Sequence, residues 1–519
     1  MSGPTPYDTW TREELIARLR HVDVYSEKKA AIVKPARHAP KPFDFSAHPR
    51  RKIALRFSYN GGEYGGLEAQ KIPTPLPTVE GVLYEALVHT KLIDPKEGMD
   101  GCGWEKCGRT DKGVSAAGQV ISLWVRSALG EVKAEADSAV EASTSSTSQD
   151  AKTTVGTSQP ADAGEDATGL EGDFALMGDW DEPPTSNSLP PPTKPTTELN
   201  YVSLLNNVLP PTIRINAWAP VAPEFSARFS CRYRHYKYFF SPHGLDLDAM
   251  RDAASRLVGE HDFRNLCKVD PQKQLTSFAR RILSAEINPA IPPHEDMYVL
   301  DLRGQAFLYN QVRHIMAVLF LVGTRLEQPS VMDALMNTDP ANPKPPSHPG
   351  EPAPPIVESK PEYQMAQPFP LVLWDCGYDP ALVRWQGGPE GAECDSGEGV
   401  YTHKQAASSL YGQLHALHER ALVQAALDAH FLRAAEPFHA PPPQCLPVGH
   451  PGSVPIAPGT TLSIPTGAGS YSRTASYVPL LQRKRGDLPE VINERWRLGK
   501  GAKRFAARMG AAEPDDADE

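Results

Sequence analysis

One long acidic segment limits where this chain can build a folded core. Residues 127–199 are rich in Ser, Thr, Asp and Pro, and the window 127–200 holds 14 acidic and 3 basic residues. Such a segment has too little apolar surface to offset the entropy lost on ordering. We therefore expect a disordered insertion at 127–199, between two folded subdomains at 52–126 and 200–378.

Local patterns in these two subdomains alternate between strand and helix. KIALRFSY, from Lys52, is typical of a strand, TVEGVLYEALVHTKLI repeats its apolar residues with a helical period, and CGRTDKGVSAAGQVISLWV leads from a turn into another strand. Beyond the insertion we expect a helix at 246–257, strands near 281–287 and 298–302, a buried helix that opens at Arg313, and a short strand in PFPLVLWDC. Together these patterns predict an α+β fold.

The two ends of the chain lie outside this pattern. Residues 1–51 predict an accessory helix, at about 7–31, and a linker. Residues 379–519 form a C-terminal extension with a predicted helix at 410–432 and a basic tail, in which 483–508 carry nine basic and three acidic residues. Three interpretations of the tail stay open: it assists the binding of an RNA, it directs nuclear import, or it is a solvated helix that packs on the core.

Charge, cysteines and motifs exclude several classes of protein. The net charge is -10, yet residues 201–330 hold 15 basic and 12 acidic residues, so an anionic partner is compatible with this region. The longest apolar run, 315–322, is far shorter than the roughly 20 residues of a membrane span. Seven scattered cysteines without a secretory leader favour a reducing compartment. We expect a soluble protein without a metal site, and the absence of Walker and GxGxxG motifs argues against cofactor chemistry.

Asp111 is the first candidate for chemistry. The sequence Thr110-Asp111-Lys112-Gly113 suits an ordinary β-turn, which is the alternative to a functional role. However, Arg313 opens a helix so uniformly apolar that its guanidinium needs a carboxylate partner. Asp111, flanked by Arg109, is the candidate. We expect the pairing to keep its pKa low and the carboxylate ionised, as nucleophilic catalysis or proton abstraction requires.

The segment 225–240 (FSARFSCRYRHYKYFF) alternates aromatic rings with cations. It suits either an amphipathic strand with one solvated basic face or a groove that binds RNA phosphates and stacks a ring on an unpaired base. In the second interpretation the phosphate contacts come from Arg228, Arg232 and Lys237.

These motifs together resemble the TruA-type tRNA pseudouridine synthases, and among them the eukaryotic branch that modifies positions 38 and 39 of the anticodon arm. The resemblance rests on KIALRFSYNGGEYGG, TVEGVLYEAL, CGRTDKGVSAAGQVISL, LLNNVLPPTIRI, FSARFSCRYRHYKYFF, GEHDFRNLCK, GQAFLYNQVRHIMAVLFLVG and PFPLVLWDC, in that order. These segments span about 52–126 and 201–378, around half the chain.

The resemblance implies a fold, an activity and a site. The family fold has two α/β subdomains whose antiparallel sheets form a continuous surface with a basic catalytic cleft, usually as a homodimer. Asp111 matches the catalytic aspartate, Arg109 shares its motif, Arg313 matches the arginine that pairs with it, and Tyr236 matches the tyrosine that stacks on the target uracil. The reaction needs no cofactor or metal.

The leading hypothesis is therefore a tRNA-uridine isomerase of the nucleus, the cytoplasm or both. Its carboxylate either attacks C1′ of the ribose or removes the 2′-proton to give a glycal, and the sequence leaves both routes open. The rival hypotheses are a non-catalytic tRNA-binding or chaperone protein of the same fold and an aspartate-dependent hydrolase, although the motifs contain no second carboxylate, His or metal constellation for the latter.

Overall fold

The structure, a computed structural model, describes residues 43–70, 74–129, 197–290, 297–388, 409–442, 462–499 and 501. The helix expected at 7–31, most of the insertion expected at 127–199 and the last part of the basic tail lie outside these residues.

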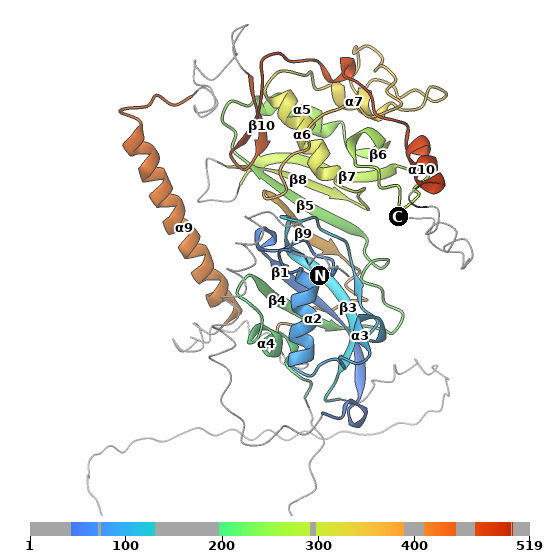
Figure 1. The fold of residues 1–519 in the computed structure, drawn as a ribbon, viewed down its shortest axis with the longest axis vertical. Coiled ribbons are helices and arrows are strands. Elements are labelled where there is room, and N and C mark those ends of the chain that lie inside the picture. Colours follow the sequence, from blue (N-terminus) through green and yellow to red (C-terminus); the bar gives the residue numbers. More distant parts are fainter. Residues whose placement is uncertain are drawn as a thin grey trace, which may run out of the picture. The chain divides into compact units, whose positions relative to one another are not determined.

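One sheet runs through the folded part of the chain (Figure 1). Its nine strands are β1 (Arg50–Tyr59), β2 (Glu105–Lys106), β3 (Ser115–Arg126), β4 (Ile213–Pro220), β5 (Tyr233–Phe240), β6 (Gly259–Asp262), β7 (Ala279–Pro289), β8 (Tyr298–Gly304) and β9 (Leu371–Gly377). Their order is β4-β1-β3-β9-β5-β8-β7-β6, with β2 paired to β3. The β3–β9 pair is parallel and the other pairs in the sheet are antiparallel. The predicted α+β fold with a continuous, mostly antiparallel sheet is confirmed.

The helices occur at most of the predicted places. They are α2 (Val79–His89), α3 (Gly98–Gly101), α4 (Tyr201–Asn206), α5 (Leu247–Ser255), α6 (Gln311–Gly323), α7 (Val331–Met336), α9 (Leu410–Ala435) and α10 (Pro489–Leu498), with short 3₁₀ helices at Phe45–Ala47, Gly61–Glu63, Arg264–Leu266 and Leu480–Gln482. None of the described helices is long and apolar enough to cross a membrane.

The first core lies between α2, α4 and the strands β1, β3 and β4. Thr78 caps α2 by accepting a hydrogen bond from the Gly81 amide at 3.2 Å, and the apolar stripe of Val79, Leu83 and Leu87 is buried. The sequence analysis placed α4 and β4 in the second subdomain. They pack in the first core instead, because β4 pairs with β1 from Ile53 to Tyr59.

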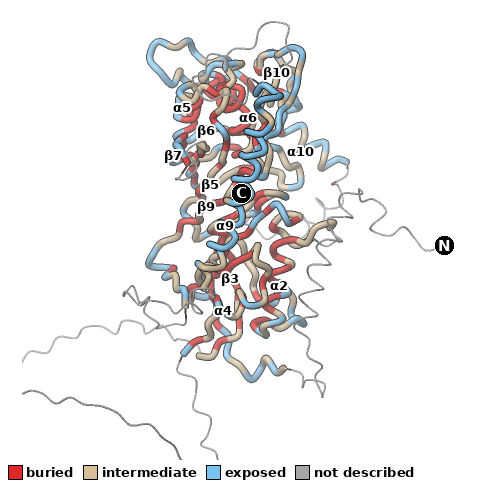
Figure 2. The backbone as a smooth tube through the Cα atoms, turned by 90° about the vertical axis from the view of Figure 1, so that its left-hand side faces the viewer, coloured by how far each residue is buried: buried red, intermediate tan, exposed pale blue. Residues whose placement is uncertain are grey.

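The second core is built by α5, α6 and α7 against β5, β7 and β8. In α6, Arg313 is the one residue between 311 and 323 that is not buried, which explains the uniformly apolar sequence of this helix. Figure 2 shows the contrast with α9, which has no buried residue.

The C-terminal extension contributes to the second core. The hairpin β10 (Leu462–Gly467) and β11 (Ser470–Thr474) is followed by Leu480, which is fully buried there. In α10, Asn493 donates a hydrogen bond to the carbonyl of Leu275 at 3.1 Å. The described part of the tail therefore packs on the core, while its predicted roles in tRNA binding and nuclear import stay predictions.

Candidate active site

The loop between β2 and β3 is held firmly from several sides. Gln119 donates a hydrogen bond to the Gly108 carbonyl at 2.9 Å, and the hydroxyls of Thr110 and Tyr59 lie 2.6 Å apart. Gly61 approaches so closely that a Cβ on it would lie 2.0 Å from the Val114 carbonyl oxygen, which explains the first glycine of NGGEYGG. The loop is thus a fixed platform for Asp111.

Asp111 meets the start of α6, as the sequence analysis expected. Arg313 Nη1 lies 3.5 Å from Asp111 Oδ2, and Asn310 donates a hydrogen bond from Nδ2 to the same oxygen. Arg313 is itself fixed, because its Nε donates to the Ala366 carbonyl at 2.9 Å. The carboxylate therefore has a cation and an amide donor on one side.

The pKa of Asp111 differs from the expectation. Burial raises the pKa of this carboxyl above its usual value, although Arg313, Asn310 and Lys268 act in the opposite direction. The expectation of a low pKa was wrong because the Asp111 side chain is only 27 % exposed and its ion pair with Arg313 is long.

Tyr236 lies in β5 where the two cores meet, and it packs against both. Its ring contacts that of Phe307 edge to face, with 5.0 Å between the centroids. Burial raises the pKa of its hydroxyl, and nearby negative groups, Asp111 among them, act in the same direction. The structure thus brings Tyr236 and Asp111 into one electrostatic environment.

Two predicted cations lie near the loop without contacting Asp111. Arg109 is exposed and pairs with Glu68 at 3.0 Å. Arg228 places its guanidinium over the ring of Phe229 at 5.1 Å. The pKa of Lys273 is lowered by burial and also by the charges of Arg109 and Arg228, so these three side chains form a basic cluster.

The other two predicted cations lie elsewhere. Only 233–240 of the basic, aromatic segment is a strand, and Arg232 precedes it, paired with Asp379. Lys237 follows Tyr236 in β5 and therefore points to the opposite face of the sheet. There it lies 3.5 Å from Asp301 and above the Trp374 ring. The expectation that Lys237 shares one groove with Tyr236 was wrong, because neighbours in a strand alternate between faces.

Three further residues belong to the site and were not predicted from the sequence. Asn310 adopts a left-handed conformation, with φ of 59°, directly before α6, and asparagine tolerates this conformation. Lys268 acts on Asp111 through its charge. Arg234 links the Cys107 carbonyl, at 3.0 Å, to the Gln305 carbonyl, at 2.8 Å. Asn310 lies three residues before the singled-out Arg313, so its position was a usable signal.

This arrangement can place a partly buried carboxylate against a sugar whose base stacks on an aromatic ring. The neighbouring cations suit a phosphate backbone. Among the described residues no group of three or more His, Cys, Asp or Glu side chains could hold a metal ion.

Comparisons with known proteins show the family to which this chain belongs. A family model described as tRNA pseudouridine synthase matches residues 253–379. The tRNA pseudouridine(38/39) synthase of Saccharomyces cerevisiae is 38 % identical over 391 residues, which cover 72 % of this chain and 72 % of that protein. The Homo sapiens protein of the same name is 36 % identical over 392 residues, covering 72 % and 65 %. A tRNA pseudouridine synthase A of Methanothrix thermoacetophila is 31 % identical over 276 residues, covering 52 % and 70 %. This chain belongs to the tRNA pseudouridine synthase family.

Proposed function

We propose that this protein isomerises uridine to pseudouridine at positions 38 and 39 of the tRNA anticodon arm, with Asp111 as the catalytic carboxylate. The observation that carries the proposal is the contact of Asp111 with Arg313 and Asn310, in the same environment as the Tyr236 ring. The names of the similar yeast and human proteins support the choice of substrate and positions.

The reaction rearranges atoms within one nucleotide. The bond between N1 of uracil and C1′ of ribose breaks, the base turns, and a bond forms between C5 and C1′; the proton of C5 is lost and N1 gains one. A carboxylate can attack C1′, or it can remove the 2′-proton and later return it. Asp111 is the candidate for either role, and no co-reactant is needed for the balance.

Three neighbours assist Asp111 in this proposal. Arg313 and Lys268 stabilise the ionised carboxylate against the effect of its burial. Tyr236 stacks on the uracil once the nucleotide has left its helix, which offsets part of the cost of unstacking. Arg109 and Arg228 supply positive charge for the tRNA backbone beside the loop.

Partners and location extend the proposal. We propose that the protein acts on tRNA as a homodimer, as the resemblance to the TruA-type family implies, and that it does so in the nucleus, the cytoplasm or both. Light scattering of the purified full chain tests the dimer, and microscopy of a tagged full chain tests the location.

The decisive experiment maps pseudouridine at single-nucleotide resolution in tRNA treated with the wild type, with Asp111→Asn, and with Asp100→Asn as a control. Asp100 is an exposed aspartate elsewhere in the first half of the chain. Pseudouridine at 38 or 39 that disappears only with Asp111→Asn supports the proposal. A wild type that binds tRNA without modifying it would favour the non-catalytic binding protein, and full activity of Asp111→Asn would remove Asp111 from the mechanism.

A further inference from the structure

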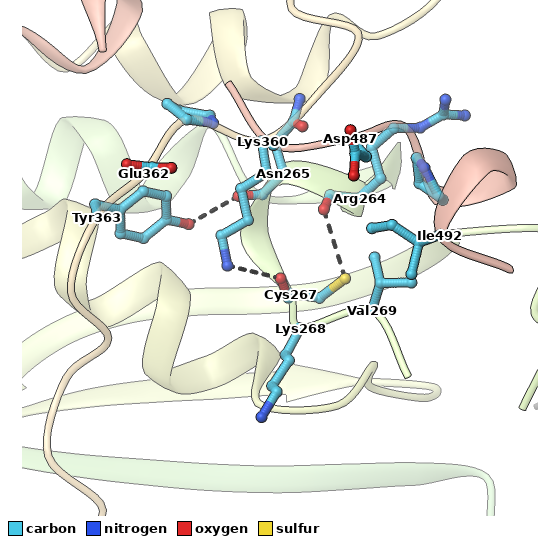
Figure 3. A pocket seen from close by; sticks show the side chains of 13 residues that line it. Arg264, Asn265, Cys267, Lys268, Val269, Lys360, Glu362, Tyr363, Asp487 and Ile492 are labelled. Carbon is cyan, nitrogen blue, oxygen red and sulfur yellow. Dashed lines mark hydrogen bonds between the residues drawn. The ribbon is translucent and has the colours of Figure 1, made fainter. Parts of the chain in front are cut away.

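A pocket of about 320 Å³ lies between the core and the C-terminal extension (Figure 3). One wall is formed by residues 264, 265 and 267–269, the second by residues 360–363, and the third by Gly486, Asp487, Pro489 and Ile492. The extension is attached beside it, because the Gly486 amide donates to the Lys360 carbonyl at 2.8 Å and the Glu362 amide donates to the Lys484 carbonyl at 3.0 Å. The volume is at the lower end for ligand pockets and suits one nucleotide.

Two lysines of the pocket have no carboxylate partner among the described residues. Lys360 Nζ contacts neutral groups, the Cys267 carbonyl at 2.8 Å and the His314 ring nitrogen Nε2 at 2.9 Å. Lys268 Nζ lies over the Tyr309 ring at 5.6 Å. The charges of both lysines act on His314, as does that of Arg313, which lies outside the pocket lining.

The carboxylates at the pocket do not balance these charges. Asp487 pairs with Arg495 at 2.8 Å, and Glu362 lies 3.7 Å from Lys484. Both carboxylates are well exposed, whereas Lys360 is half-buried. The pocket therefore has an excess of positive charge, which favours an anionic ligand.

The remaining lining is mostly apolar and can accept a flat ring. Figure 3 shows Ile492 next to Val269, while the Tyr363 hydroxyl is directed to the Asn265 carbonyl, to which it donates at 2.8 Å. Apolar and aromatic walls with a few polar groups are typical of sites for unpaired bases.

The pocket is joined directly to the catalytic loop. The Lys268 amide donates to the Tyr309 carbonyl at 2.9 Å, and the next residue, Asn310, binds Asp111. Lys268 also acts on the pKa of Asp111. The wall of the pocket at Lys268 is therefore bonded to the segment that orients Asp111.

We propose that this pocket binds a nucleotide of the tRNA chain next to the target uridine, with its base between Val269, Ile492 and Tyr363, and with Lys268 and Lys360 supplying charge for the flanking phosphates. The inference rests on the proposed function, since it takes the RNA at Asp111 as given. It assigns to the C-terminal extension a part in holding the substrate.

The test fills the pocket from the side of the extension. Ile492→Trp blocks it, and Val491→Trp is the matched control, because Val491 is the exposed neighbour on α10 and is absent from the lining. Each change is placed in the Asp111→Asn protein, so that binding is measured without turnover. The probes are an anticodon stem-loop RNA and two versions of it with one abasic nucleotide, on the 5′ or the 3′ side of the target uridine.

We expect Ile492→Trp to weaken binding of the intact RNA by about tenfold, the scale of one stacked base, and Val491→Trp to leave it unchanged. To the Val491→Trp control, one of the two abasic RNAs should bind about tenfold more weakly than intact RNA. To Ile492→Trp, the same abasic RNA should bind within about twofold of intact RNA, because the base has already lost its pocket. If both abasic RNAs lose the same affinity in both proteins, the pocket does not hold a base.

A second pair of variants covers the case in which Ile492→Trp does not fold. Lys360→Met should reduce the dependence of log Kd on log salt by about 0.7, the value of one phosphate contact on a single strand. Lys96→Met, at an exposed site in the first half of the chain, is the control and should leave this dependence unchanged. Equal slopes for the two variants would overturn the assignment of Lys360. The proposed function is tested separately, because it fails if the wild type forms no pseudouridine in the mapping experiment.

Discussion

Asn310 donates a hydrogen bond from its side-chain amide to Asp111, from which it is 199 residues distant in the chain. Asn310 occupies the residue before α6 in a left-handed conformation that directs its amide to the loop of the first half. The carboxylate of one half is thus oriented by the helix start of the other half, which also supplies Arg313.

The Asn310→Gly variant tests this relationship. Glycine keeps the positive φ without strain, so the change removes the amide donor alone. Since that hydrogen bond lowers the pKa of Asp111, its loss should raise this pKa, and the acid limb of kcat should move to higher pH. We expect kcat to fall about tenfold, the scale of one hydrogen bond to a charged group, with little change in KM.

The control for this variant is Lys91→Gly, which introduces glycine at another residue with positive φ, in the first half. It should leave the pH profile unchanged. An unshifted acid limb in Asn310→Gly would show that the amide does not act on Asp111.

Tyr236 separates the effect of an aromatic ring from that of a hydroxyl. Tyr236→Phe keeps the ring and its edge contact with Phe307, so we expect activity within about tenfold of the wild type. Tyr236→Leu removes the stacking surface and should lower kcat/KM by about ten- to hundredfold. Phe239→Leu, on the opposite face of β5, is the control. Equal losses in Tyr236→Leu and Phe239→Leu would point to a general packing defect.

Much of the fold follows from local sequence, whereas the site depends on long-range packing. The alternation in KIALRFSY predicted β1, and the apolar run after Arg313 predicted α6 together with its need for Asp111. The pairing of β4 with β1 could not be predicted, because a strand pattern does not specify its partner.

The errors at the site have the same origin. The pKa of Asp111 depends on how deeply the loop between β2 and β3 is buried, and the sequence does not reveal this burial. Arg109 pairs with Glu68, 41 positions earlier, and this partner could not be predicted from the motif; the expected part of Arg109 in catalysis stays a prediction. Lys237 shows the opposite case: strand alternation alone could have placed it away from Tyr236.

His314 should make the protein sensitive to acid. Burial, reinforced by the charges of Lys360, Arg313 and Lys268, lowers its pKa to about 2, and the Tyr363 ring packs on it edge to face. The folded protein therefore keeps this histidine neutral, while the unfolded chain takes up a proton below its ordinary pKa of about 6.5. Because the unfolded state then binds more protons, stability falls as the pH drops below this value.

We expect the wild type to lose about 2 kcal/mol more than His314→Gln between pH 7 and pH 5. The measurement is the free energy of unfolding in urea at each pH, with His89→Gln, at an exposed site, as the control. The same pH dependence in the wild type and His314→Gln would contradict the prediction.

We expect the buried residue Glu198 to let the core tolerate removal of most of the insertion. Its carboxylate accepts hydrogen bonds from Arg51 at 2.9 Å, Ser127 Oγ at 2.5 Å and the amides of Ala128 and Leu199, both at 2.8 Å. These bonds join the residues on either side of 131–196 and, despite burial, hold the pKa of Glu198 below its usual value. A chain with 131–196 replaced by a short Gly-Ser link should therefore keep its turnover within about twofold.

Glu198→Gln should cost about 1–3 kcal/mol of stability, in the full chain and in the shortened chain alike, because it removes the charge that Arg51 faces. Glu97→Gln, at an exposed pair with Arg50, is the control and should cost less than about 1 kcal/mol. Urea unfolding measures the stability, and pseudouridine mapping the turnover, of the shortened chain, of Glu198→Gln in the full and the shortened chain, and of Glu97→Gln. If the deletion alone lowers turnover tenfold, residues 131–196 act on the substrate. If turnover falls only when Glu198→Gln is present, the loss is due to the hydrogen bonds of Glu198.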